Sequence, residues 1–297
     1  MVRLLLTLTL LSLSVQPALS ICKARLEGDL RISDGDYDPF DALDFRRTHR
    51  ITIRNIGDSR CDFIVGFRRQ PPSGYLAWFL RYRIEDASGQ ALLTEQVPST
   101  TGASHLIFAS VPPSQTASAD YSLVMSRGQL AFPGTYQDDR VTLSLHVRDS
   151  QGRIGAEEQD TEPLQITQTV KASVGISVAG GGLTTTLNFG DLATGQERSV
   201  MLQARANHAY SLLLRSQNGG AMKLDPEIPG QSWTIPYSLR VNSAAVSLLP
   251  SSTIHRSFPR HSDGAESHML AFRIEDMPDR RAGFYRDVIT VEISVDP

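Results

Sequence analysis

Hydrophobic and polar residues alternate without interruption near the C-terminal end of the chain. Ile289, Val291, Ile293 and Val295 are separated by single polar residues, so they fall on one face of an extended segment. A period of two with β-branched side chains is typical of a strand that packs one face against a core. The pattern therefore predicts a β-strand over residues 289–295, with these four side chains pointing inward.

The five residues just before this strand repeat an earlier part of the chain. The pattern Gly-x-Tyr-x-Asp occupies residues 134–138 and 283–287, and alternating hydrophobic residues follow both copies. Two copies about 150 residues apart predict two similar domains in tandem. In immunoglobulin-like sandwiches, a tyrosine near the start of a late strand holds the preceding corner through its hydroxyl, and we expect this role for Tyr136 and Tyr285.

Short β-type segments recur through the rest of the chain, with Gly, Asn and Pro between them. Spacings of roughly 8 to 12 residues are typical of all-β sandwiches. We therefore expect two tandem immunoglobulin-like β-sandwich domains, over residues 21–160 and 161–297. The run at 164–178 crosses this boundary. Its first part, 164–170, is expected to close the N-terminal domain as its final strand, and 172–178 to open the C-terminal domain.

Two stretches of the first domain carry local signals. Residues 49–56 and 61–67 alternate as strands on either side of Gly57-Asp58, which predicts a β-hairpin. Residues 34–41 are polar and are expected to form a loop. Their spaced aspartates resemble a calcium loop, but Pro39 takes the place of the glycine and no glutamate closes the loop. A solvated turn is therefore favoured, and no metal is expected.

Composition and charge narrow the class of protein. The 297 residues are 40% hydrophobic and 21% charged, which is typical of folded globular chains. The net charge of -3 gives no reason to expect a nucleic acid partner.

Residues 1–20 combine Arg3, a short apolar run and small residues at Ala18 and Ser20, which predicts a signal peptide and export through the inner membrane.

Export would place the cysteines in an oxidising compartment. Cys22 and Cys61 are the only two in the chain, so they are expected to form a disulfide within the first domain. Closing a loop of about 40 residues stabilises a fold by roughly 4 kcal/mol on the chain-entropy estimate.

The most aromatic stretch of the chain runs from Tyr75 to Leu80. One interpretation is a central strand that is buried on both faces. The other is an apolar loop at the free end of the first domain, because exposed aromatic patches mark contact surfaces. Under the second interpretation, Tyr75, Trp78 and Phe79 are candidate surface contacts.

The C-terminal domain is expected to lack its last strand. An immunoglobulin-like sandwich has a seventh strand after the one that follows the tyrosine corner, and the sequence ends at Pro297. The absent strand would bury four or five apolar side chains, each contributing roughly 1.5 to 3 kcal/mol. We therefore expect an open groove, lined by Ile289, Val291, Ile293 and Val295, that accepts a donor strand from another protein.

Short motifs follow one another in order along the C-terminal domain. They are Leu187-Asn188-Phe189-Gly190-Asp191-Leu192-Ala193-Thr194-Gly195, Asn207-His208-Ala209-Tyr210, Ser216-Gln217-Asn218-Gly219-Gly220, Ile235-Pro236-Tyr237 and Gly283-Phe284-Tyr285-Arg286-Asp287. Together they resemble the pilins of archaic, Csu-type chaperone–usher pili, which are related to spore coat protein U domains. The resemblance covers most of residues 172–297, with weaker traces at 37–39 and 134–138.

The resemblance implies a non-enzymatic, adhesive subunit of a surface pilus, without a cofactor. Such a subunit is held by a periplasmic chaperone, passed to an outer-membrane usher and completed by a strand from a neighbouring pilin. It would pass through the periplasm to the cell surface. The predicted mature chain starts at Ile21 with Cys22 already engaged, which leaves no spare strand to donate. This feature and the extra N-terminal domain are similar to the two-domain tip adhesins of these pili. An abiotic surface, a host glycan and a protein receptor all stay open as the ligand.

Three alternatives remain open. A self-contained secreted binding module would be stable without a partner. A periplasmic chaperone, which also has two immunoglobulin-like domains, would have complete domains and a long donor strand of its own. A periplasmic metal-dependent enzyme would use His255, His261 and His268, but their spacing fits no zinc motif and no Gly-x-Ser-x-Gly nucleophile motif occurs.

Overall fold

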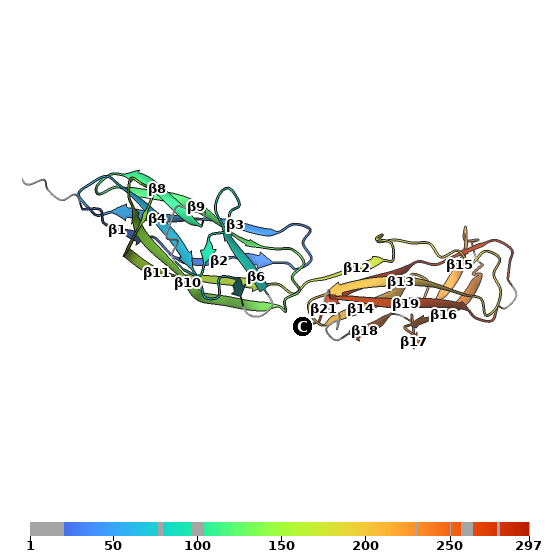
Figure 1. Cartoon of the computed structure of the whole chain (residues 1–297). Helices are drawn as coiled ribbons and strands as arrows, with labels where there is room; N and C mark the ends of the chain where they lie inside the picture. The colour runs from blue at the N-terminus through green and yellow to red at the C-terminus, as the bar shows by residue number, and fades with distance from the viewer. Residues whose placement is uncertain are drawn as a thin grey trace, which may run out of the picture.

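The computed structural model describes residues 21–76, 80–96, 104–229, 231–249, 251–256, 264–277 and 280–296. Within these ranges the chain forms strands, turns and irregular segments but no helix, and so no helix that could cross a membrane. Two β-sandwich domains lie end to end in an elongated molecule (Figure 1). The predicted class, all-β with two tandem sandwich domains, is confirmed. The predicted signal peptide lies outside the described residues.

The first domain contains two sheets that enclose one core. One sheet has the order β1-β3-β9-β6-β5, and the other has the order β2-β11-β10-β4-β7 with β8 also pairing with β4. The strands are β1 (Ala24–Glu27), β2 (Arg31–Tyr37), β3 (Phe45–Asn55), β4 (Cys61–Arg68), β5 (Gly74–Leu76), β6 (Leu80–Glu85), β7 (Leu93–Thr94), β8 (His105–Val111), β9 (Thr116–Met125), β10 (Gly134–Arg148) and β11 (Ile154–Val170).

The second domain has a larger and a smaller sheet. The larger has the order β12-β13-β19-β16-β15-β20 with β17 on β16, and the smaller has the order β18-β14-β21. The strands are β12 (Val174–Val178), β13 (Glu197–Ala206), β14 (Tyr210–Ser216), β15 (Ala221–Asp225), β16 (Thr234–Val241), β17 (Ala244–Val246), β18 (Ser252–Arg256), β19 (Ala265–Ile274), β20 (Phe284–Arg286) and β21 (Ile289–Val295).

The strand that closes the first domain is longer than expected. β11 starts at Ile154, passes through the expected boundary at residues 160 and 161, and remains in the first domain's sheet to Val170, opposite Gly134. The second domain's first strand begins at Val174. The link between the two sandwiches is therefore only a few residues long.

The predicted hairpin of residues 49–56 and 61–67 is wrong. β3 and β4 lie in different sheets, so the turn between them crosses the sandwich. Buried Asn55 holds this crossing, because its amide donates to the carbonyls of Ser59 and Val111 and its side-chain oxygen accepts from the Gly57 N–H. Alternation predicts that a segment is a strand, but it does not determine which sheet the strand joins.

Residues 34–37 also differ from the expected loop, because they belong to β2. This strand runs parallel to the end of β11, with Thr169 opposite Asp36 and Val170 opposite Tyr37. Tyr37 is 1% exposed, and its hydroxyl donates to the Ser126 carbonyl at 2.9 Å. Burial of Ile32 and Tyr37 in the core outweighs the polar composition of the segment.

The two tyrosine corners are confirmed. The Tyr136 hydroxyl donates to the Phe132 carbonyl at 2.7 Å, and the Tyr285 hydroxyl donates to the Arg281 carbonyl at 2.8 Å. Both tyrosines thus reach back four residues, so the repeated sequence pattern encodes the same local structure in both domains.

The predicted disulfide is also present. Cys22 and Cys61 are bonded with a Cα–Cα distance of 5.8 Å. Cys22 precedes β1 and Cys61 opens β4, so the bond joins the two sheets of the first domain.

Replacing both cysteines by serine should lower the free energy of unfolding of the first domain by about 4 kcal/mol, because the unfolded loop regains its conformational freedom. Domain-resolved denaturation, followed by hydrogen exchange, measures this change. The second domain serves as the internal control, and an equal loss in both domains would contradict the prediction.

Candidate functional site

Within the described ranges, strand β21 has a partner on one side only. It pairs antiparallel with β14, from Ser216 opposite Ile289 to Tyr210 opposite Val295. None of the strands in the described part of the chain pairs with its other side. We call this side the open edge. It carries backbone N–H and C=O groups that a further strand could bond.

The side chains predicted to line a groove lie along this edge. Ile289, Val291 and Ile293 pack against the second core, yet they and Val295 remain partly exposed. Other partly buried hydrophobic residues surround the same core, and they include Val174, Ile176 and Val178 of β12 and Leu187 and Phe189 of the segment that follows it. β12 and β21 are in contact. The second core is thus incompletely covered along β12 and β21.

The first domain shows what the same edge looks like when it is closed. The Gly-x-Tyr-x-Asp pattern that precedes β21 also opens β10. In β10, however, the alternating residues Val141, Leu143 and Leu145 are each 0% exposed. They are covered because β11 pairs along β10 and buries Leu164 and Ile166 against the same core. Equivalent residues therefore differ in exposure because one domain contains the covering strand and the other domain, as described, does not.

The neighbours of the covering strand also correspond between the domains. In the first domain β11 lies between β10 and β2, and β2 follows β1 in the chain. In the second domain the segment that follows β12 holds Leu187 and Phe189 against the core without forming a strand. By its place in the chain this segment is the counterpart of β2, as β21 is the counterpart of β10. The described part of the second domain therefore has counterparts of both neighbours of β11 but no counterpart of β11 itself.

The aspartates of the repeated pattern anchor β10 and the start of β21. Asp138 accepts hydrogen bonds from the Arg69 guanidinium and the Tyr82 hydroxyl, both at 2.7 Å. Asp287 likewise accepts from Ser216 at 2.6 Å and from the Tyr237 hydroxyl. Burial, followed by the neighbouring carboxylate, raises the pKa of Tyr82 and of Tyr237. The sequence pattern pointed to the aspartates but not to their partners, which lie far away along the chain.

Of the three candidate surface contacts, the structure describes Tyr75, which lies on β5 and pairs with Arg81 of β6. Tyr75 is half-buried beneath the Arg81 guanidinium, 5.2 Å from the ring centre. The backbone N–H of Arg81 donates to the Gln129 side chain. The next residue, Leu130, lies against the second domain at Gly264. This side of the hairpin thus lies near the domain junction, not at the free end. Trp78 and Phe79 lie outside the described residues, so their contact role stays a prediction.

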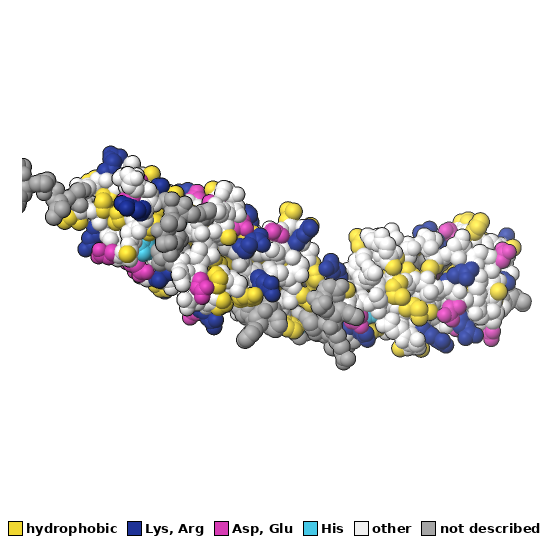
Figure 2. Space-filling view, in the orientation of Figure 1, with side chains coloured by type: hydrophobic (Ala, Val, Ile, Leu, Met, Phe, Trp, Pro, Cys, Tyr) yellow, Lys and Arg dark blue, Asp and Glu magenta, His cyan; other side chains and the backbone are white. Residues whose placement is uncertain are grey.

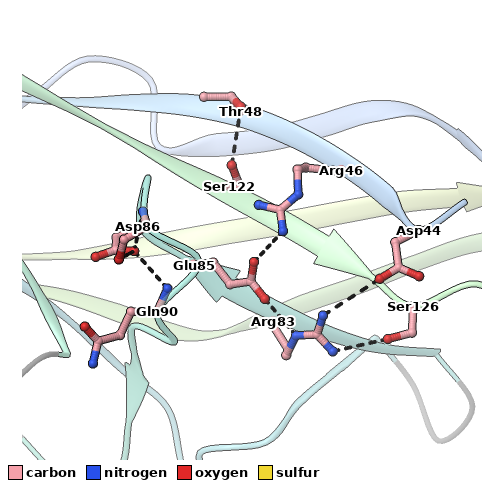
Figure 3. A network of polar contacts seen from close by, with 10 residues as sticks. Asp44, Arg46, Thr48, Arg83, Glu85, Asp86, Gln90, Ser122 and Ser126 are labelled. Carbon is pink, nitrogen blue, oxygen red and sulfur yellow. Dashed lines mark hydrogen bonds and ion pairs between the residues drawn. The ribbon is translucent and has the colours of Figure 1, made fainter.

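The outer face of the β3-β9-β6 sheet is a network of polar pairs (Figure 3). Glu85 accepts from Arg46 at 2.6 Å and from Arg83 at 2.9 Å, and Thr48 and Ser122 share a hydrogen bond. Burial acts to raise the pKa of Glu85, but the two guanidinium groups outweigh it and lower the pKa. The charged and polar groups of this network are hydrogen-bonded to one another, as is typical of the outer surface of a sheet.

Charged side chains of both signs are interspersed over the face shown in Figure 2, without an extended basic area. In the described ranges, no group of three or more His, Cys, Asp and Glu side chains could hold a metal ion. Of the three histidines considered for an enzyme, His261 lies outside these ranges. His268 belongs to a polar network inside the second domain.

That network fixes the protonation of His268. The Asn242 side-chain oxygen accepts from the Met269 N–H, so its amide nitrogen donates to His268 Nδ1 at 3.2 Å. The proton of neutral His268 is therefore on Nε2, which donates to the Tyr210 hydroxyl at 2.7 Å. Tyr210 in turn donates to Glu266, which is paired with Arg256.

No family model matches the chain, and no curated protein matches it. Among solved structures it is similar to a chain of the CsuC–CsuE chaperone–tip adhesion subunit pre-assembly complex from archaic chaperone–usher Csu pili of Acinetobacter baumannii. The match has a TM-score of 0.51 and 14% identity, and it covers 90% of this chain and 99% of that one. The Pseudomonas aeruginosa CupB6 tip adhesin matches over 93% of each chain with a TM-score of 0.39 and 10% identity.

The adhesive subunit CfaE of the CFA/I fimbria of enterotoxigenic Escherichia coli matches over 90% of this chain and 98% of that one, with a TM-score of 0.34 and 10% identity. The Csu likeness extends over nearly the whole of both chains and shows a shared fold. The resemblance to Csu-type subunits noted in the sequence is thus confirmed at the level of the fold.

The second domain should lose stability as the pH falls below about 6.5, the ordinary pKa of histidine. His268 is 0% exposed, and burial lowers its pKa, although the Glu266 charge opposes the shift. Below pH 6.5, His268 therefore binds a proton in the unfolded chain but stays neutral in the folded domain. The expected loss approaches about 1.4 kcal/mol for each pH unit until the folded pKa is reached.

Denaturant titrations at pH 7.5 and 5.5 measure this dependence for the wild type and for His268→Gln. The variant should show a smaller difference between the two pH values, because its side chain does not titrate. Equal pH dependence in both proteins would contradict the assignment to His268.

Proposed function

We propose that this protein is an adhesive subunit of a chaperone–usher pilus, and that the open edge of β21 accepts an extended strand from another protein. One observation carries the proposal. The same sequence pattern opens β10 and precedes β21, yet β10 is covered by β11, whereas no strand of the described ranges pairs with the outer edge of β21, whose apolar side chains stay partly exposed. Strand addition at an exposed edge is a general mode of recognition that supplies main-chain hydrogen bonds and side-chain pockets.

The energy available from strand addition is large on the scale of a single domain. Each apolar side chain that becomes fully buried contributes roughly 1.5 to 3 kcal/mol, so four or five of them contribute about 6 to 15 kcal/mol in gross terms. Typical domains have a net stability of about 5 to 15 kcal/mol. The second domain is therefore expected to depend on its partner strand for much of its stability.

The first domain also supplies a template for the direction of the added strand. β11 runs antiparallel to β10 and parallel to β2. A strand that completes the second domain in the same manner runs antiparallel to β21. Its first residues then face Val295 and its last residues lie near Gly283.

The partners follow from this mode of assembly. A periplasmic chaperone holds the subunit first, an outer-membrane usher receives it, and a neighbouring pilin then donates the permanent strand. The solved complex with the shared fold joins a chaperone to a tip adhesion subunit, which supports a chaperone as the first partner. Export by the predicted signal peptide and display at the cell surface complete the route.

We place the subunit at the tip of the pilus. The first domain is closed by its own β11, so it needs no donated strand and can serve as the adhesive part. The aromatic segment with Tyr75, Trp78 and Phe79 stays the candidate contact, although Tyr75 lies near the domain junction and not at the free end. The ligand is an abiotic surface, a host glycan or a protein receptor. The protein acts by binding and assembly, not by catalysis.

Replacing Val291 by Asp should abolish strand addition, because a charge would be buried beneath the added strand without a partner. Thr290→Asp is the matched control, since Thr290 is exposed and faces Arg215 across the ladder with β14. The probe is a synthetic eleven-residue peptide in which Val and Thr alternate, with a lysine at its C-terminus for solubility. Binding to the full chain is followed by fluorescence anisotropy and by domain-resolved thermal unfolding.

The probe at a hundred times its Kd should stabilise the second domain of the wild type and of Thr290→Asp by about 2.7 kcal/mol. It should leave the second domain of Val291→Asp unchanged. If the wild type does not bind the probe and its second domain unfolds as cooperatively as the first, the protein is a self-contained module and the proposal is wrong.

A further inference from the structure

A cavity of about 420 Å³ lies between the two domains, at the end of the open edge. Asp38 and Phe40 line it from the first domain, and Val174, Arg205 and Val295 line it from the second. Val174 is the first residue of β12 and Val295 the last residue of β21. The cavity therefore continues directly from the vacant strand position into the domain junction.

The walls of the cavity are held in place by specific contacts. The Lys171 ammonium group pairs with the Asp38 carboxylate at 2.9 Å, and the Arg205 guanidinium lies 5.2 Å from the centre of the Phe40 ring. The second contact joins the two domains, because Arg205 belongs to β13 and Phe40 follows β2.

Buried Asn207 fixes the junction behind these walls. Its amide nitrogen donates to the carbonyl of Ala131 in the first domain at 3.1 Å and to that of Lys171 in the link at 2.9 Å. Its oxygen accepts from the Ser173 N–H at 2.8 Å. One side chain of the second domain thus satisfies backbone groups of the first domain and of the link, and the cavity keeps a defined shape.

The direction of the added strand brings its first residues to this cavity. In the first domain, β11 begins opposite the end of β10, where Ile154 faces Arg148, and it ends opposite Gly134. A strand with the same direction in the second domain begins opposite Val295. The C-terminal end of β21 lies at the junction between the domains (Figure 1). One residue of the added strand faces Val295, and the residues on its N-terminal side would therefore extend toward the cavity.

We propose that the donated strand extends past β21 into this cavity, where an apolar side chain near its N-terminal end packs against Phe40, Val174 and Val295. The inference rests on the proposed function, because it concerns the same donated strand. Its consequence is that the first domain takes part in recognising the donor. The donor then contacts both domains, and its docking stiffens the junction that transmits force from the adhesive domain to the pilus.

The test compares two versions of the alternating Val–Thr probe on the full chain. One version begins with Leu-Thr before the alternating segment, and the other begins with Gly-Thr. The leucine version should bind the wild type about tenfold more tightly, because the cavity walls shield part of the leucine side chain from water. In Phe40→Ala, which removes one apolar wall of the cavity, the preference should fall below about threefold.

Cross-linking provides a second readout that depends on position and direction. The two native cysteines are bonded to each other, so a single introduced cysteine reacts alone. Ala172→Cys, at the cavity, should form a disulfide with a probe that carries cysteine at its N-terminus. Phe284→Cys, which is exposed near the other end of the edge, should react only with a probe that carries cysteine at its C-terminus.

The outcomes separate the inference from the proposed function. If neither probe binds the wild type, both are overturned. If both probes bind with equal affinity and the N-terminal cysteine does not cross-link to Ala172→Cys, the donor ends before the cavity. In that case the further inference is wrong and strand addition stands. Tenfold preference with cross-linking at Ala172→Cys supports both.

Discussion

The structure depends on one constraint, which is that the backbone groups and apolar side chains of a sheet edge must be covered. The first domain meets this constraint internally, because β11 pairs along β10 and leaves Val141, Leu143 and Leu145 fully buried. The second domain, as far as it is described, does not, because β21 is paired only with β14. A long, apolar, unpaired edge promotes association with other strands. Here the uncovered edge belongs to a strand that comes after the same Gly-x-Tyr-x-Asp pattern that the covered strand β10 carries.

The two domains therefore differ at this edge, which is covered in the first domain and uncovered in the second domain as it is described. The first domain carries the disulfide between Cys22 and Cys61, and it buries the ion pair of Arg69 and Asp138 at 3% and 2% side-chain exposure. The second domain has no cysteine and keeps many core residues partly exposed. Between them, Asn207 fixes a short link, so forces and contacts at one domain reach the other through a defined junction.

Local sequence patterns predicted the parts of the fold that depend on local chemistry. Alternation located β21, and the repeated Gly-x-Tyr-x-Asp pattern located both tyrosine corners, because a tyrosine that reaches back four residues needs only its own turn. The crossing between β3 and β4 and the strand at residues 34–37 were missed, because both are decided by distant partners, the Val111 carbonyl for Asn55 and β11 for β2. For the same reason the sequence indicated the side chains along the open edge but not the cavity at its end, whose walls come from segments that meet only in the folded chain.

Hydrogen exchange of the native protein tests the central claim most directly, because the two domains provide the closed and the open edge in one molecule. Without a partner, the amides of β21 that do not bond to β14 should exchange rapidly, while those of β10 that bond to β11 remain protected. Addition of the strand probe should protect the β21 amides and leave the β10 amides unchanged. Slow exchange along the whole of β21 in the isolated protein would show that its outer edge is already covered, and the account of a vacant strand position would be wrong.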